Sequence, residues 1–532
     1  MKKYQKKNRI YFIGALVSIF ISNLFAVVLQ FFKGDVLDYA VAGEIQTTIK
    51  YAVLLITFIL CEVMTYFCHR QFSARFVVGC TKELKHDIFA SILSRDFVSY
   101  KEQTQGEYIA KYTNEADTIK ERLFNMLPMF WDILSKIIFV SVALFMLDWK
   151  IAIITIALLT TPLYIPKIIE KSLQNAQTAY IQSIEDNLAK VNDWLSGFEI
   201  IKNYSIEKKV MEKFKSVNDK SMEKLLHDTQ LGAVSQLITT LISYLSYFIV
   251  LVCATWLVLR GDFSAGDFFV AIGMIDQLSY PLISLAGITR QLIAVKPACA
   301  SMEQFLDSPT QQQNNTELKE IHSNIKFTDV CFAYDNQDPI IENFNLTIQK
   351  GKRYLFKGPS GCGKTTTVNL LLRYFNICGG SIEIDNVSLA QIGSTYGCMT
   401  VVRQEATLFH DTLRNNLTMY HDISESRIFE VLNSVGLEKY SNVDVLDSMV
   451  VESGSNFSGG EKKRICLARA LLRDTDVLIL DEPLTNLDTE TAERIEDLLL
   501  SIRDKAIIVV SHQFTENKLQ SFHRIVDFTK AN

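Results

Sequence analysis

A glycine-rich stretch at residues 358–365 constrains the fold of this 532-residue chain more than any other feature. It matches the phosphate-binding pattern G-x-x-x-x-G-K-[ST]. An apolar run at 353–357 precedes it and a run typical of a helix, 366–372, follows it, which is the strand–loop–helix context that the pattern needs. The backbone N–H groups of such a loop surround phosphate oxygens, and the helix N-terminus adds partial positive charge. A chance glycine-rich turn is the alternative, which this context disfavours.

The loop and the start of its helix therefore supply the first predicted site residues. They are Gly358, Pro359, Ser360, Gly361, Cys362, Gly363, Lys364, Thr365 and Thr366. In a loop of this kind Lys364 reaches the β- and γ-phosphates of a bound nucleotide, and the Thr365 hydroxyl is a ligand for Mg²⁺.

A second motif follows about a hundred residues later. The apolar run 477–480 reads as a buried strand and ends at two carboxylates, Asp481 and Glu482. In this arrangement Asp481 holds Mg²⁺ and Glu482 activates the attacking water. We therefore predict phosphoryl transfer to water, with catalysis coming mainly from positioning and charge neutralisation.

Between the two motifs lies Phe457-Ser458-Gly459-Gly460-Glu461. It resembles the signature of ATP-binding cassette (ABC) proteins, which is usually Leu-Ser-Gly-Gly-Gln. With all three motifs in order, nearly the whole chain resembles an ABC transporter subunit of the exporter type. The resemblance implies a membrane all-α domain of six transmembrane helices followed by an α/β P-loop ATPase domain, with ATP and Mg²⁺ bound to the latter.

The resemblance also assigns roles to residues outside the loop. It implies that Tyr334 stacks on adenine, that Gln404 completes the shell of Mg²⁺ and water, and that His512 contacts the γ-phosphate as a catalytic partner of Glu482 and Lys364. Asp488 matches the family's D-loop aspartate, and Glu452 resembles a residue of the short loop before the signature that reaches the opposite subunit.

A further implication is that one chain cannot complete a site. Ser458, Gly459 and Gly460 would bind the γ-phosphate of ATP held by another subunit, so a second half-transporter is the expected partner. Because the chain carries both halves of a competent site, a homodimer is permitted. A heterodimer stays open, since the Glu461 carboxylate could weaken a neighbouring phosphate site.

Composition supports a membrane protein. Hydrophobic residues make up 48% of the chain and the mean hydropathy is +0.14, which favours membrane spans. The formal net charge is −5 and no domain is basic, so nucleic acid is not an expected partner. The ten cysteines show no C-x-x-C spacing or compact Cys/His pattern, and we expect reduced thiols.

Six stretches are apolar enough to span a lipid bilayer. They are residues 10–32, 49–68, 128–147, 150–168, 232–259 and 268–290. Lysine and arginine gather in the two long loops after the second and fourth stretches. The excess of positive charge on cytoplasmic loops therefore places both termini, these loops and the ATPase domain in the cytoplasm, with the protein in the cell membrane.

The predicted organisation is a transmembrane domain at 1–306, a polar linker at 307–324 and a nucleotide-binding domain at 325–532. Helical spacing predicts that the two long cytoplasmic loops continue the membrane helices. By the resemblance, short coupling helices near 97–105 and 191–197 would touch the ATPase domain.

Away from the ends of the predicted spans, four charged residues fall inside them, namely Glu62, Asp132, Lys136 and Asp276. Such residues are costly in a bilayer and often functional. Pairing within a water-filled vestibule and contact with substrate both stay open.

Three functions are consistent with these observations. The first is ATP-driven export by alternating access in a dimer, and the second is uptake by an exporter-fold importer of siderophores or metal chelates. The third is an ATP-gated channel or sensor, which the presence of Glu482 and His512 disfavours. The transported substrate is not identified.

Overall fold

The computed structural model divides the chain into two compact units. The first comprises Met1–Ile92 and Gln105–Ser308, and the second comprises Leu93–Thr104 and Pro309–Asn532. The structure describes residues 1–161, 165–307, 318–334, 338–451, 454–485, 487–512 and 514–529. Residues 308–317 of the predicted linker, and Glu452, lie outside the described residues.

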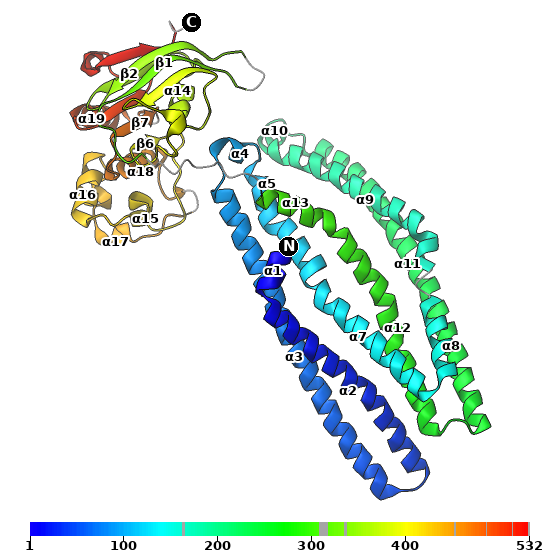
Figure 1. Cartoon of the computed structure of the whole chain (residues 1–532). Coiled ribbons are helices and arrows are strands. Elements are labelled where there is room, and N and C mark those ends of the chain that lie inside the picture. Colours follow the sequence, from blue (N-terminus) through cyan, green and yellow to red (C-terminus); the bar gives the residue numbers. More distant parts are fainter. Residues whose placement is uncertain are drawn as a thin grey trace. The chain divides into compact units, whose positions relative to one another are not determined.

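The first unit is helical (Figure 1). Its helices are α1 (Lys2–Lys7), α2 (Arg9–Val41), α3 (Ile45–Leu93), α5 (Gln105–Ala110), α6 (Ala116–Ile119), α7 (Met126–Leu147), α8 (Trp149–Thr160), α9 (Ile165–Ser196), α10 (Phe198–Asn203), α11 (Glu207–Arg260), α12 (Ala265–Ala294) and α13 (Lys296–Leu306), with π-helical turns at Lys111–Glu115 and Lys120–Phe124.

Among the described residues, five helices are long and apolar enough to cross a membrane. They cover residues 9–41, 45–93, 105–147, 207–260 and 265–306. The predicted fourth span, 150–168, begins as the shorter apolar helix α8 and continues in α9, and residues 162–164 between them lie outside the described part of the chain.

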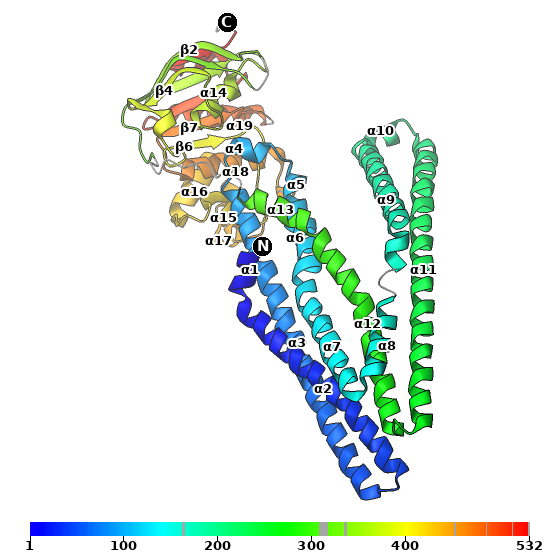
Figure 2. The same cartoon turned by 45° about the vertical axis from the view of Figure 1, so that its right-hand side comes forward.

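Most of these helices extend well beyond the predicted apolar stretches, as the helical spacing in the long loops indicates. α9 and α11 run side by side and are joined by α10 (Figure 2). α12 packs on α7 and α2 through a buried apolar cluster that includes Val140, Leu144, Met274 and Ile275.

Polar side chains also join the membrane helices. The Asn23 side-chain amide, on α2, donates to the Asp132 carboxylate at 3.1 Å and to the Ser135 hydroxyl at 2.8 Å, both on α7. The Nδ1 atom of buried His69 lies 3.0 Å from the carbonyl oxygen of Ala15. Asp132 and His69 thus contribute to helix packing, because a buried polar group needs a partner of this kind.

The second unit contains two sheets and the helices around them. Its strands are β1 (Asn324–Phe332), β2 (Ile341–Gln349), β3 (Arg353–Lys357), β4 (Gly379–Ile384), β5 (Val387–Ser388), β6 (Met399–Val402), β7 (Val477–Asp481), β8 (Ala506–Val510) and β9 (Arg524–Asp527). Its helices are α4 (Phe97–Lys101), α14 (Lys364–Leu371), α15 (Leu413–Thr418), α16 (Glu425–Ser434), α17 (Val443–Leu446), α18 (Gly459–Leu472) and α19 (Thr489–Ser501), with 3₁₀ turns at Leu389–Gln391, Glu438–Tyr440 and Glu516–Ser521.

Strand order explains how distant motifs meet. One sheet is antiparallel in the order β2-β1-β4-β5, and the other has the order β6-β7-β8-β3-β9 with parallel pairing throughout. Every residue of β7 and of β8 is buried, as expected for strands covered on both faces. Ligands of such sheets bind at the carboxyl ends of the strands. The phosphate-binding loop, Gln404, Asp481 with Glu482, and His512 follow β3, β6, β7 and β8 respectively, so they share one edge.

Helix α4 belongs to the second unit, although its sequence lies between segments of the first unit. Asp96 caps it by accepting the Ser99 N–H at 2.7 Å. The Phe97 ring stacks on Tyr374, with centroids 3.9 Å apart and an interplanar angle of 11°, and meets Phe375 edge-on at 6.2 Å. This is the segment that the resemblance identified as a coupling helix.

Candidate active site

A cavity of about 490 Å³ lies at the shared strand edge. Most of the predicted site residues line it, namely Tyr334, Ser360, Gly361, Gly363, Lys364, Thr365, Thr366, Gln404, Asp481, Glu482 and His512. Ile340, Thr485 and Val510, which the sequence did not single out, line it as well. The predicted catalytic and Mg²⁺-binding residues of one chain therefore line a single cavity.

The phosphate-binding loop depends on glycine where it turns. Gly363 has a φ of +96°, and a side chain there would also crowd Ile340 and Ile341 at 3.2 Å. The Lys364 side chain is only 7% exposed, and its ammonium donates to the carbonyl oxygens of Gly358 and Pro359, both at 2.7 Å. The loop thus holds a buried cation beside backbone N–H groups, which is an arrangement suited to a phosphate anion.

Two of the three predicted Mg²⁺ ligands, Thr365 and Asp481, lie together. The Thr365 hydroxyl donates to the Asp481 carboxylate at 3.3 Å. Burial raises the pKa of Asp481, and this effect is opposed by Arg403 and by the Thr365 hydrogen bond. A buried carboxylate beside a hydroxyl offers the hard oxygen donors that Mg²⁺ prefers, so these residues fit the ion.

Glu482 occupies a special backbone position next to Asp481. Its φ is +50°, in the left-handed region that residues with a side chain rarely adopt. Its N–H donates to the Val510 carbonyl at 2.8 Å, and its carboxylate accepts from the Thr485 hydroxyl at 3.5 Å. The His512 imidazole lies 3.8 Å from the same carboxylate. The carboxylate and the imidazole therefore face one another at the cavity wall.

Tyr334 stands at the cavity rim. Its hydroxyl lies 3.2 Å from the Thr366 hydroxyl, and its ring meets Phe332 and Phe375 edge-on at 5.0 Å and 5.2 Å. These contacts fix the ring where a planar base can stack on it.

Seven predicted residues do not line this cavity, and three of them, Gly358, Pro359 and Cys362, belong to the phosphate-binding loop. Ser458, Gly459 and Gly460 form the start of helix α18, where Ser458 and Gly459 are exposed. Asp488 is exposed and caps helix α19 by accepting the Thr491 N–H at 2.9 Å, a hydrogen bond that lowers its pKa. The signature and Asp488 thus lie outside the lining of their own chain's cavity.

The signature carboxylate, Glu461, is paired within its own chain. It accepts hydrogen bonds from the Ser458 N–H at 2.8 Å and from the Tyr440 hydroxyl at 2.9 Å, and it forms an ion pair with Lys439. The Glu461 N–H in turn donates to the Ser458 hydroxyl at 3.2 Å, which completes a capping box. Burial works to raise the pKa of Glu461, but the hydrogen bonds from Lys439, Ser458 and Tyr440 outweigh it and lower the pKa to about 2.

Sequence reasoning missed Lys463. This residue is 5% exposed on helix α18, and its ammonium donates to the backbone carbonyl of Glu482. Burial lowers the pKa of Lys463, while the nearby carboxylates of Glu482 and Asp481 act in the opposite direction. A lysine next to a signature motif reads as a solvated residue, and no local pattern indicates that it turns inward.

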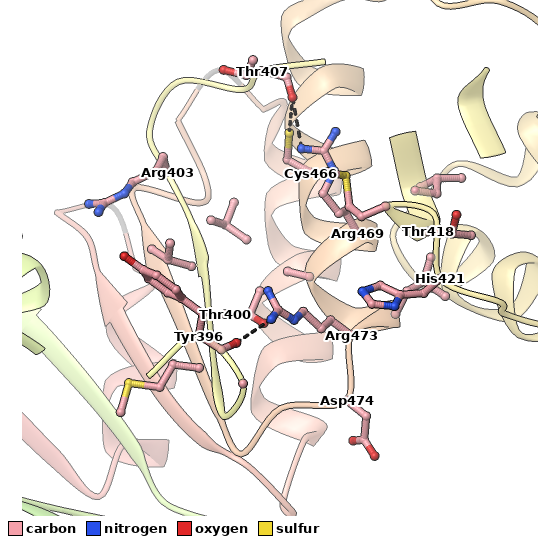
Figure 3. Close-up of a pocket in the computed structure, with 18 of the residues that line it drawn as sticks. Tyr396, Thr400, Arg403, Thr407, Thr418, His421, Cys466, Arg469, Arg473 and Asp474 are labelled. Atoms are coloured by element: carbon pink, nitrogen blue, oxygen red, sulfur yellow. Dashed lines mark hydrogen bonds between the residues drawn. The ribbon is translucent and has the colours of Figure 1, made fainter. Parts of the chain in front are cut away.

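A second, larger hollow of about 690 Å³ lies elsewhere on this unit, between strand β6 and helices α15 and α18 (Figure 3). The Arg473 side chain donates to the Tyr396 carbonyl, and Arg469 and Cys466 both point at the Thr407 carbonyl, at 3.1 Å and 3.8 Å (Figure 3). Its wall is otherwise largely apolar, with Met399, Leu417 and Ile423 among the lining residues. A groove with this lining could bind a polypeptide segment that carries apolar side chains.

Comparison with known proteins agrees with this architecture. The family model described as "ABC transporter transmembrane region" matches residues 9–282, and the model described as "ABC transporter" matches residues 341–485. The chain is 29% identical over 484 residues to the multidrug resistance-like ATP-binding protein MdlB of Buchnera aphidicola, covering 87% of this chain and 81% of that protein. It is 25% identical over 461 residues to the ATP-dependent lipid A-core flippase of Syntrophus aciditrophicus, covering 84% and 76%.

A solved structure shares the fold. The structure of a bacterial Atm1-family ABC exporter with ATP bound superposes with a TM-score of 0.80 at 20% identity, covering 98% of this chain and 93% of that one. The membrane-region match spans more than half of the chain and is fused to an ATP-binding match in the same polypeptide. On this evidence, the chain belongs to the ABC transporter family and has the exporter fold.

Proposed function

We propose that two copies of this chain form an ATP-driven exporter in the cell membrane, which moves its substrate by alternating access. ATP binding would close the two ATPase domains on each other and open the transmembrane cavity outward. Hydrolysis at Glu482 would release the domains and reset the cavity. The ATPase domains and both chain termini would lie in the cytoplasm, as the charge of the long loops indicates.

One observation carries this proposal. The phosphate-binding loop, Asp481, Glu482 and His512 surround one cavity, whereas the signature residues Ser458–Gly460 lie outside it at an exposed helix start. A complete site therefore needs a signature from a second copy, which favours a dimer in which two identical half-sites face each other.

The residues support in-line attack of water on the γ-phosphoryl group. Lys364 and the loop N–H groups would hold the phosphates, and Tyr334 would hold the base. Glu482 would orient the water and accept its proton, and His512 would hold the γ-phosphate from the other side. Thr365, Asp481 and Gln404 would hold Mg²⁺, which when bound neutralises charge on the phosphate oxygens.

The larger groove supports the same assembly. At the tip formed by α9 and α10, Leu195, Phe198 and Ile200 are exposed. Soluble surfaces rarely leave several large apolar side chains together without a partner. We assign this tip of one copy to the groove of Figure 3 on the other copy, where it would act as the second coupling helix.

The names of the relatives bear on the direction of transport. One is called multidrug resistance-like and another a lipid A-core flippase, and both names favour export. They do not define the substrate of this chain, which has only 25–29% identity to these proteins.

The proposal is tested by expressing this chain alone and reconstituting it into nanodiscs and inside-out vesicles. We expect a monodisperse dimer with cooperative ATPase activity and ATP-dependent uptake of an amphipathic dye into inverted vesicles. A monomer that hydrolyses ATP only after a second subunit is added would rule out the homodimer. ATP-dependent movement in the opposite direction would establish an importer, and turnover without movement of any compound would contradict transport.

The ion pair of Glu461 yields a prediction about whether this carboxylate weakens the neighbouring ATP site. Because the Lys439 ammonium neutralises this carboxylate and Tyr440 donates a hydrogen bond to it, Glu461→Gln should change the KM for ATP by no more than about twofold. Lys439→Met should raise that KM roughly three- to tenfold, because it removes the cation that balances the negative charge of a carboxylate beside the γ-phosphate position. The double variant should recover the parent KM, and its failure to do so would show that Lys439 acts through another group.

The same pairing has a pH signature. Since the pKa of Glu461 is lowered to about 2, its contribution to stability is present above the unfolded value and is lost only as pH falls through about 2. The KM effect of Lys439→Met should therefore be the same at pH 6 and pH 8.

A further inference from the structure

Lys463 is an unusual side chain for the interior of an ATPase domain. It lies on helix α18 five positions after Ser458, is 5% exposed, and directs its ammonium at the backbone carbonyl of Glu482. A buried ammonium is costly unless it is paired, and an apolar side chain of similar volume would fill the same space without that cost. Its position therefore points to a role other than packing.

The group that it contacts is strained. Glu482 has a φ of +50°, and a residue with a side chain keeps such a conformation only where its surroundings hold it. Its N–H is held by the Val510 carbonyl of strand β8, and its carbonyl also accepts the Thr485 N–H at 3.4 Å. Lys463 supplies the described contact that ties this carbonyl to α18, so the direction of the Glu482 carboxylate depends on where that helix lies.

Helix α18 thus connects two different ATP sites. Under the proposed function, on which this inference rests, its first residues would contact ATP held by the other copy. Lys463 lies about 7.5 Å further along the axis, at 1.5 Å per residue, and holds the Glu482 that serves its own copy's ATP. A helix is stiff over this length, so a shift at its start is transmitted to the Glu482 turn.

We propose that Lys463 is a positioning residue that couples the two ATP sites of the dimer. When the signature binds ATP held by the partner, the position of helix α18 becomes fixed. Lys463 then holds the backbone of Glu482 so that its carboxylate is placed for hydrolysis. Each site is then competent only when the neighbouring site is filled, which makes hydrolysis cooperative in ATP.

The test is Lys463→Met in the full chain in nanodiscs. Methionine has a similar volume and cannot donate a hydrogen bond. We expect kcat to fall about tenfold, the KM for ATP to stay within about twofold, and the Hill coefficient to fall to one. The melting temperature should be unchanged or higher, because a buried charge is removed. Lys463→Gln, which keeps a donor without the charge, should retain most of kcat and of the cooperativity.

Lys462→Met is the matched control. This neighbouring lysine loses the same charge on the same helix, and its side chain makes no described hydrogen bond to the Glu482 turn, so kcat and the Hill coefficient should not change. Parent-like kcat and cooperativity in Lys463→Met would overturn the proposal. So would a parallel loss of nucleotide binding and melting temperature in both the Met and Gln variants, since that indicates a purely structural role.

Failure of the proposed function would be recognised in the parent protein. If the unsubstituted chain is a monomer, the dimer is wrong whatever the Lys463 variants do. If it is a dimer that hydrolyses ATP with a Hill coefficient of one, its two sites are not coupled and the coupling role of Lys463 falls. If the parent is a cooperative dimer and Lys463→Met behaves like it, the dimer stands and the coupling role of Lys463 falls.

Discussion

Replacing Glu482 by glutamine is expected to reduce ATP turnover on the order of 10³-fold while leaving nucleotide binding intact. The amide keeps the shape of the side chain and its hydrogen bond with Thr485, but it cannot accept a proton from water. Because binding survives and hydrolysis stops, two copies should accumulate as an ATP-bound dimer. The change is read by steady-state ATPase activity together with size-exclusion chromatography in the presence of ATP.

The matched control for this variant is Glu490→Gln. Glu490 is an exposed carboxylate in the first turn of α19, and its loss should leave turnover at the parent rate. Turnover of Glu482→Gln within about twofold of the parent would mean that another group accepts the proton, and the assignment of Glu482 as general base would then be wrong.

Lys364→Ala is expected to weaken ATP binding about 10- to 100-fold, because a charge-assisted hydrogen bond to phosphate is lost from a buried site. The ammonium already lies among the carbonyl oxygens of Gly358 and Pro359, so its removal also loosens the loop itself. The effect should appear in the dissociation constant of a fluorescent ATP analogue, measured at equilibrium so that hydrolysis does not enter.

Lys357→Ala is the control here, since Lys357 ends the strand that leads into the loop and its side chain is exposed. Its ATP affinity should match that of the parent. Unchanged affinity in Lys364→Ala would contradict the placement of the phosphates in this loop.

Motifs at strand ends could be predicted from the sequence because each carries its own local signal. The glycine pattern marks the loop after β3, and a buried apolar run ending in two carboxylates marks Asp481 and Glu482 after β7. Parallel strand pairing then brings the carboxyl ends of these strands to one edge of the sheet. This arrangement is expected once the sequence is identified as a P-loop domain. The catalytic roles of these residues stay predictions until they are measured.

The side-chain contacts that tune the site could not be predicted. Glu461 meets Tyr440, which is 21 residues away in the sequence, and Lys463 meets Glu482, which is 19 residues away. Both contacts arise from the packing of α18 against other elements, and no periodicity or spacing encodes them. For this reason the Glu461 carboxylate first suggested a weakened site, whereas the structure pairs it locally.

The stacking of Phe97 on Tyr374 has a consequence for exchanging parts between relatives. A recombinant gene that joins this membrane half to a foreign ATPase at the linker keeps residues 93–104 with the wrong partner, because the fold assigns them to the ATPase side. An aromatic face without its stacking neighbour loses about 1 kcal/mol and a defined orientation. The structural unit that contains the ATPase is therefore encoded by two separate stretches of the gene. A working hybrid would have to take residues 93–104 from the same parent as the C-terminal half.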